Sequence, residues 1–176
     1  MAIVKASYTA SPKAARATVR YIAARPNAQG VRQSRQLFDS QGGTGRLQAY
    51  AMIDGASPGD YFYRLAISPD PRSENPRGDL HLRAVTEETI RALAESTGKP
   101  LDWVAVIHTD HTQIPHVHCL AIVHGRLDRA ALAAAREGAT LECQLQRREL
   151  DAYRQAEQDR SWEEEAQWDY SSPSSS

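Results

Sequence analysis

Three histidines carry the clearest chemical signal in this sequence of 176 residues. They lie between Trp103 and Gly125, in WVAVIHTDHTQIPHVHCLAIVHG, where two apolar segments flank a polar turn and predict a β-hairpin. His116 and His118 are two residues apart, so they project from the same face of a strand. Pairing His108 with His116 leaves seven residues for the turn and places all three imidazoles on one side of the sheet.

Three neutral imidazoles can hold one metal ion and leave coordination positions open for a phosphate oxygen. A divalent metal ion is therefore the expected cofactor, with Mn or Mg in use and Zn, Ni or Co able to occupy the site. Asp110 shares the strand parity of His108, so it could orient an imidazole, assist a proton transfer or simply form the turn. His81, His111 and His124 lack such spacing, and we expect them to be structural or on the surface.

Positive charge is concentrated in the N-terminal part of the chain, although the net charge is −1. Residues 1–46 contain eight Lys or Arg and one acidic residue, whereas residues 137–176 contain four basic and ten acidic residues. A basic region of this kind is expected where a protein binds phosphates. The arginines expected to contact DNA are Arg16, Arg20, Arg25, Arg32 and Arg35.

The remaining patterns predict the elements that position these residues. Strands are expected at residues 2–9, 61–68, 103–109 and 116–123, and helices at 12–24, 46–54, 86–98, 128–137 and 141–168. Ser11 and Asp128 are expected helix caps, and Thr86 an expected helix start. Residues 27–45 are polar and Gly-rich, which predicts a mobile loop. These elements favour an α+β fold, in which helices flank a mostly antiparallel central sheet of about five strands.

The segment His108-Thr-Asp110-His-Thr-Gln-Ile-Pro115-His116-Val-His118 resembles the HUH motif of conjugative and mobilisation relaxases. The likeness includes the eight-residue step between the first two histidines, the aspartate two residues after the first, and Pro-His-Val-His. The resemblance implies a palm-like arrangement and an enzyme that nicks single-stranded DNA at a transfer origin. It also implies a tyrosine linked to the 5′ phosphate, a freed 3′ hydroxyl and accessory relaxosome proteins as partners.

Relaxases of this kind carry their nucleophile on an early helix, before the histidines. The segment Ala17-Thr-Val-Arg-Tyr21-Ile-Ala is similar to their pattern of a basic residue followed by Tyr-Ile, so the resemblance implies Tyr21 as the nucleophile. Arg20 and Arg25 flank Tyr21, and helical spacing places Arg25 nearer to its face. The structural alternative for Tyr21 is an aromatic side chain in the core.

We expect three segments: an HUH nuclease domain at residues 1–140, an acidic helical region packing on it at 141–169, and a disordered tail at 170–176. No apolar run reaches the roughly 18 residues of a membrane span, and the N-terminus lacks the apolar segment of a secretory signal. Two cysteines cannot form a disulfide framework, so we expect a cytoplasmic protein.

Three other functions remain open at the level of sequence. The first is a rolling-circle replication initiator or transposase-like HUH nuclease that uses Tyr153 as its nucleophile. The second is a non-catalytic DNA-binding module with zinc, although structural zinc normally has four protein ligands. The third is a metal-dependent hydrolase of a small phosphoester, which would turn over without a covalent protein adduct.

Overall fold

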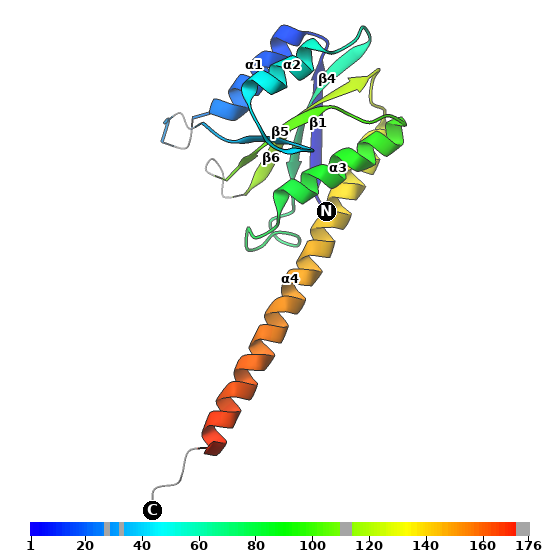
Figure 1. Ribbon diagram of the computed structural model, residues 1–176. Coiled ribbons are helices and arrows are strands. Elements are labelled where there is room, and N and C mark those ends of the chain that lie inside the picture. The colour runs from blue at the N-terminus through cyan, green and yellow to red at the C-terminus, as the bar shows by residue number, and fades with distance from the viewer. Residues whose placement is uncertain (27–28, 32–33, 110–113, 172–176) are drawn as a thin grey trace, which may run out of the picture.

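The described residues form one antiparallel sheet of six strands, flanked by four helices (Figure 1). The structure is a computed structural model that describes residues 1–26, 29–31, 34–109 and 114–171. The strands are β1 (Ile3–Thr9), β2 (Leu37–Asp39), β3 (Gly42–Thr44), β4 (Asp60–Ser68), β5 (Trp103–His108) and β6 (His116–His124). The helices are α1 (Pro12–Ala24), α2 (Arg46–Asp54), α3 (Leu82–Thr97) and α4 (Arg129–Ser171). The strand order is β1-β4-β6-β5-β2-β3, and every pairing is antiparallel. The expected α+β fold is confirmed, with the predicted hairpin of β5 and β6 at its centre.

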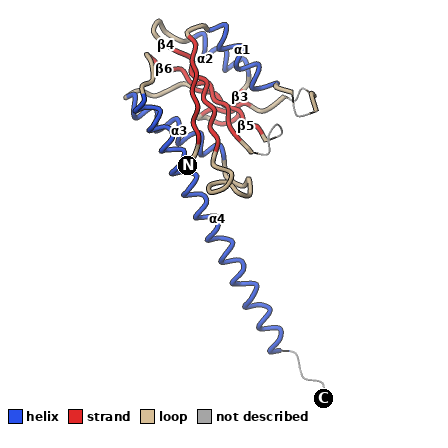
Figure 2. Tube along the Cα trace, turned by 180° about the vertical axis from the view of Figure 1, so that it is seen from behind, coloured by secondary structure: helices blue, strands red, loops and turns tan. Residues whose placement is uncertain are grey.

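A helical layer covers each face of the sheet: α1 and α2 lie on one face, α3 and α4 on the other (Figures 1 and 2). Because side chains alternate along a strand, the two faces have separate cores. Even-numbered residues of β5 and β6, such as Val104 and Leu120, pack with α1 and α2. Odd-numbered residues, such as Ala105 and Cys119, pack with α3 and α4. The parity of a residue number in these strands therefore tells which face its side chain occupies.

Several predicted helix ends are confirmed. The Ser11 side chain accepts a hydrogen bond from the backbone of Ala14 and caps α1, which ends at Ala24 as expected. Asp128 caps α4 by accepting from the backbone of Ala131 at 2.8 Å. Gly98 ends α3 in the left-handed conformation, with φ of 70°, which glycine adopts without steric cost.

The predicted loop at residues 27–45 is wrong in its second half, where β2 and β3 form a hairpin. β2 joins the sheet through the pairing of Phe38 with Ala105, and this hairpin raises the strand number above the expected five. Phe38 is buried because its ring packs edge-on against Trp103 and beneath the guanidinium of Arg83. Strands of three residues among glycines give almost no local pattern, so tertiary packing decides their conformation.

The predicted start of a helix at Thr86 is wrong, because α3 already begins at Leu82. Thr86 is buried inside the helix, and its hydroxyl donates to the carbonyl of Leu82 at 2.8 Å. A threonine can satisfy its hydroxyl in this way within a helix, although the residue is more typical of a cap.

The predicted break between two C-terminal helices after Glu137 is wrong as well. α4 continues from Arg129 to Ser171, so the proposed domain boundary at residue 140 falls inside one helix. Gly138 does not end the helix but lies where α4 packs against α3. A Cβ at Gly138 would stand only 2.8 Å from the Cβ of Ala92, so glycine permits this close approach.

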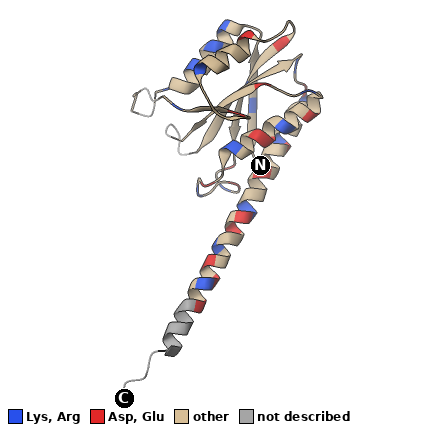
Figure 3. Cartoon of the chain, viewed as in Figure 1, with Lys and Arg blue, Asp and Glu red and all other residues tan. Residues whose placement is uncertain are grey.

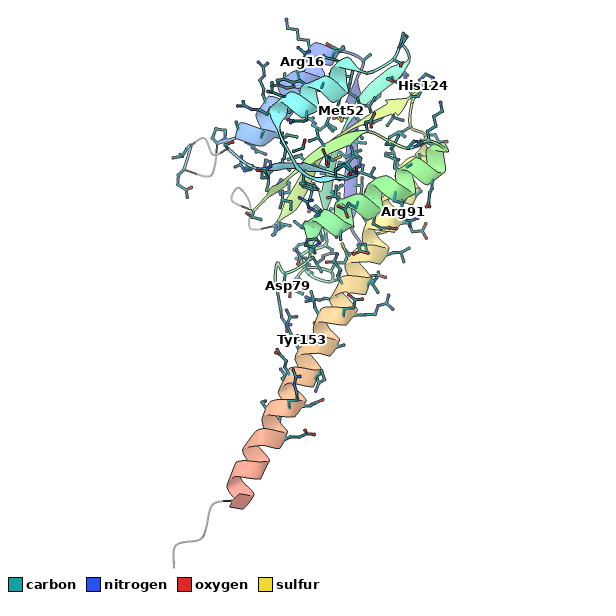
Figure 4. The ribbon with its side chains drawn as sticks, viewed as in Figure 1. Arg16, Met52, Asp79, Arg91, His124 and Tyr153 are labelled. Atoms are coloured by element: carbon teal, nitrogen blue, oxygen red, sulfur yellow. The ribbon has the colours of Figure 1, made fainter. Side chains whose placement is uncertain are left out.

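Asp79 anchors the middle of α4 to the body of the protein (Figure 4). It accepts hydrogen bonds from Arg147, at 3.1 Å, and from Arg154. Burial by itself would raise the pKa of Asp79, but the two arginines outweigh it and lower the pKa to about 2. Beyond Arg154, α4 extends away from the sheet (Figure 1). No helix in the described part of the chain is both long and apolar enough to cross a bilayer.

Asp79→Asn is expected to lower the free energy of unfolding at pH 7 by about 1–2 kcal/mol, because the folded state stabilises the carboxylate. The pKa of Asp79 in the folded protein, about 2, lies below its unfolded value, so this contribution is complete above about pH 5. It is lost as the pH falls from about 4 toward 2. Urea unfolding between pH 3 and pH 7 should therefore show the gap between wild type and variant narrowing in acid.

Glu95→Gln is the matched control, since Glu95 forms an exposed ion pair with Arg91 within α3. This substitution should lower the free energy of unfolding by no more than about 0.5 kcal/mol. An effect of Asp79→Asn that is equally large at pH 3 and pH 7 would contradict the assigned role of the carboxylate.

Candidate metal centre

The side chains of His108, His116 and His118 converge at one end of the central hairpin. The register pairs His108 directly with His116, and His118 follows on the same face. The ring centroids are 4.9–5.4 Å apart, and one nitrogen from each ring lies within 4.8 Å of the others. All three numbers are even, so the cluster lies on the face that carries α1 and α2. The predicted convergence of the three imidazoles is confirmed.

Two backbone carbonyl groups orient the first two rings. Nε2 of His108 lies 3.0 Å from the carbonyl oxygen of Ile22, and Nδ1 of His116 lies 3.1 Å from that of Ile114. A carbonyl oxygen only accepts, so these two ring nitrogens carry the protons. The lone pairs that could bind a metal ion are then on Nδ1 of His108 and Nε2 of His116. Carbonyl partners of this kind hold a ligating imidazole in one orientation.

His118 is the member of the cluster whose environment most clearly calls for a ligand. Both of its ring nitrogens are buried, and neither has a hydrogen-bond partner among the described residues. An unmet buried polar atom costs about 1–3 kcal/mol, so such atoms usually have a bound partner. Burial, followed by the neighbouring imidazoles and then by the charges of Arg25 and Arg64, lowers the pKa of His118 to about 4. The ring is therefore neutral at pH 7, which is the form that binds metals.

The donor set fits a divalent metal ion. Bonds of about 2.0–2.1 Å place two nitrogens on one ion about 3–4 Å apart, so small side-chain rotations suffice to bring this cluster around an ion. In the part of the chain that the structure describes, the group contains only the three histidines, with no carboxylate or thiol. Three protein ligands leave positions for a substrate oxygen, which is typical of reactive metal sites.

The last turn of α1 lies against this cluster. The carbonyl of Ile22 is one of the four that lack a partner within the helix, and His108 supplies its donor. The adjacent side chain, Tyr21, is 51% exposed, so the alternative of a core aromatic is wrong. The guanidinium carbon of Arg25 lies 5.6 Å from the centroid of the Tyr21 ring. Arg25 is therefore the arginine beside Tyr21, as helical spacing predicted.

In comparisons with protein families, curated proteins and solved structures, no match was found for this chain. The chemistry of the site thus rests on the side chains of β5, β6 and the end of α1. Three imidazoles could hold a metal ion, and an exposed phenol and a guanidinium lie on the helix end that contacts His108. Such a set can neutralise the charge of a phosphodiester and offer it a nucleophile.

The predicted DNA-binding arginines fall into two groups. Arg16 and Arg20 lie on the side of α1 that faces α2, where they line a cavity of about 510 Å³. Arg16 pairs there with Asp54 and lies over the ring of Tyr50. This side of the helix is separate from the turn that contacts the histidines, so the structure does not bring Arg16 and Arg20 together with the cluster.

The second group lies at the end of α1 next to the cluster. The side chain of Arg35 donates to the carbonyl of Arg25 at 2.7 Å, and the backbone NH of Arg35 donates to the carbonyl of Ala23. Arg25 and Arg35 therefore lie together at the end of α1, the end that contacts His108. Two other predicted site residues, Arg32 and Asp110, lie outside the described residues.

One basic residue near the histidines was not predicted. Arg64 lies on β4, two residues from Ala66, which pairs with His118. Arg64 and Ala66 are both even-numbered, so their side chains share the face of His118, and Arg64 is exposed there. The sequence feature that could have identified Arg64 is its position as a charged residue in the middle of the apolar segment YFYRLAIS.

Tyr153, the alternative nucleophile, lies on α4, which packs on the opposite face of the sheet from the histidines (Figure 4). Its side chain is exposed, and its hydroxyl donates to Glu157 at 2.9 Å. That hydrogen bond raises the pKa of Tyr153. Figure 4 shows Tyr153 on the part of α4 that extends beyond the sheet, away from the hairpin of β5 and β6. His124, at the other end of β6, is exposed and pairs with Asp60, as expected of a surface histidine.

Removing one imidazole is expected to weaken metal binding by about 100-fold or more. Titration calorimetry with Mn or Zn should show this loss for His116→Gln and for His118→Ala. In wild type, metal at 100 times its Kd should raise the free energy of unfolding by about 2.7 kcal/mol, and a chelator should reverse the effect.

His124→Ala is the matched control, because His124 is on the same strand and the same face but far from the cluster. Its affinity for metal should equal that of wild type. Loss of binding in His124→Ala, or wild-type binding in both cluster variants, would show that the ion binds elsewhere.

Proposed function

We propose that this chain is the nuclease domain of an HUH-type relaxase, which nicks single-stranded DNA at a transfer origin and becomes linked to it through Tyr21. The observation that carries the proposal is the contact between α1 and the histidine cluster. The hydrogen bond from His108 to the Ile22 carbonyl brings the turn that contains Tyr21 against three imidazoles able to share one ion. The sequence motif and this arrangement support the same assignment.

In the proposed reaction, the phenol oxygen of Tyr21 attacks the scissile phosphorus and the bond from phosphorus to the 3′ oxygen breaks. The phenol loses its proton, the departing 3′ oxygen gains one, and one phosphodiester replaces another. No water is consumed, so the strand can be rejoined by the reverse step. Lewis acidity toward a phosphate oxygen is the chemistry that a bound divalent ion, Mn or Mg in use, supplies at the imidazoles.

Other residues of the chain have supporting roles in this proposal. Arg25 brings positive charge next to Tyr21, where it can offset charge that accumulates on the phosphate. Asp110 is proposed to accept the phenol proton or to orient an imidazole. The two cysteines are free and buried, which agrees with the proposed location in a reducing cytoplasm. Accessory relaxosome proteins are the proposed partners at the origin.

Tyr21→Phe is expected to abolish the covalent adduct, because it removes the attacking oxygen and leaves the helix intact. Labelled single strands from candidate transfer origins, incubated with Mn and separated under denaturing conditions, should give an adduct with wild type. The variant should form at least about 10³-fold less. A chelator should suppress the wild-type adduct, as should His116→Gln.

Tyr153→Phe is the control for Tyr21→Phe, and it also separates the rival functions. It should form the adduct at the wild-type rate. If only Tyr153→Phe lost the adduct, the protein would belong with replication initiators or transposase-like nucleases. DNA binding without any adduct would favour a non-catalytic zinc module, and turnover of a small phosphoester without an adduct would favour a hydrolase.

A further inference from the structure

The sheet face that carries the histidines is covered by helices only in part. On β1, Ile3, Lys5 and Ser7 point to this face, and all three are exposed. Arg64 on β4 is exposed on the same face. An uncovered area of sheet therefore adjoins the metal centre on the side of β4 and β1.

The strand register aligns this area with the cluster. His118 pairs with Ala66, and Ala66 pairs with Lys5, so the three residues form one row across β6, β4 and β1. Two strand spacings place the Lys5 backbone about 10 Å from that of His118. Arg64 lies two residues along β4 from the row, about 7 Å from Ala66.

Neither basic side chain has an acidic partner within the described part of the chain. Other arginines form ion pairs with acidic residues, for example Arg16, Arg91 and Arg147. A lysine on an edge strand can also serve to prevent pairing with another sheet. That role explains neither the exposed Arg64 on the second strand nor the alignment of Lys5 with His118. Two cations without an acidic partner among the described residues, beside a candidate metal centre, are complementary to a chain of phosphates.

We propose that Lys5 and Arg64 bind backbone phosphates of single-stranded DNA on the uncovered face of β1 and β4, next to the metal centre. This inference rests on the proposed nicking function. The strand crosses β6, β4 and β1, and its phosphates meet Lys5 and Arg64 outside the segment held by Tyr21 and the histidines. The contacts recognise charge, so they do not depend on base sequence. Ile3, an exposed apolar side chain on the same face, is placed to contact a base.

The test is the salt dependence of binding to a fluorescein-labelled oligomer of twenty thymidines, without metal, between 50 and 200 mM KCl. Each phosphate contact contributes about 0.7 to the slope of log affinity against log salt for single strands. Lys5→Gln combined with Arg64→Gln should therefore lower the slope by about 1.4. The loss of affinity over this salt range should be about 7-fold smaller than in wild type.

Lys99→Gln combined with Arg129→Gln removes the same charge from exposed positions away from this face and should leave the slope unchanged. Lys5→Arg combined with Arg64→Lys keeps both charges and should retain the wild-type slope. An unchanged slope in the double glutamine variant, with an unchanged melting temperature, would overturn the proposal. So would an equal decrease in the Lys99 and Arg129 control.

The covalent-adduct assay tells this proposal apart from the nicking function. If wild type forms the adduct but the double glutamine variant keeps the wild-type slope, the nicking function stands and the phosphate contacts do not. If the slope falls by about 1.4 but no candidate origin gives an adduct, the surface binds DNA and the nicking function fails.

Discussion

The hydrogen bond between His108 and the carbonyl of Ile22 fixes where α1 ends, and the rest of the histidine face depends on that position. The carbonyl would otherwise lack a partner at the helix end, and His108 is fully buried, so losing the bond would leave polar atoms unmet inside the protein. The same ring offers its other nitrogen to the cluster. One imidazole therefore links the position of the Tyr21 turn to the orientation of a ring in the histidine cluster. A change in either is transmitted to the other through a rigid ring.

The sheet separates the face that carries the histidine cluster from the face on which α3 and α4 pack. On the second face, α3 and α4 pack closely at Gly138, and Asp79 ties α4 to the loop before α3. None of these contacts involves the histidine cluster. The cluster instead lies where β5 ends and β6 begins, at the margin of the α1 and α2 core, with His108 buried and His116 and His118 partly exposed. This separation lets a stable framework hold a site that contains unmet polar atoms.

Much of the site could be predicted from sequence because its geometry is local. The two-residue period of a strand and the length of one turn suffice to bring His108, His116 and His118 together. The start of α1 follows from Ser11, and its end from Pro26, in the same way. What could not be predicted depends on contacts between distant segments. The register of β4 with β6 places Arg64 beside His118, and the packing of Phe38 against Trp103 creates the β2–β3 hairpin. Gly138 also could not be predicted from sequence, because the need for glycine inside α4 comes from the close approach of α3.

The net charge of −1 gives a misleading picture of how this protein would meet DNA. At physiological salt, charges are screened beyond about 8 Å, so a phosphate responds to the residues around it rather than to the total. α1 contains basic residues and no acidic ones, whereas the coloured part of α4 carries charges of both signs (Figure 3). A strand on the histidine face would meet Arg25, Arg64 and Lys5, which lie on the face opposite to the one that α4 covers. The acidic residues of α4 would repel DNA from that helix, and the segregation of charge would direct a strand toward the imidazoles.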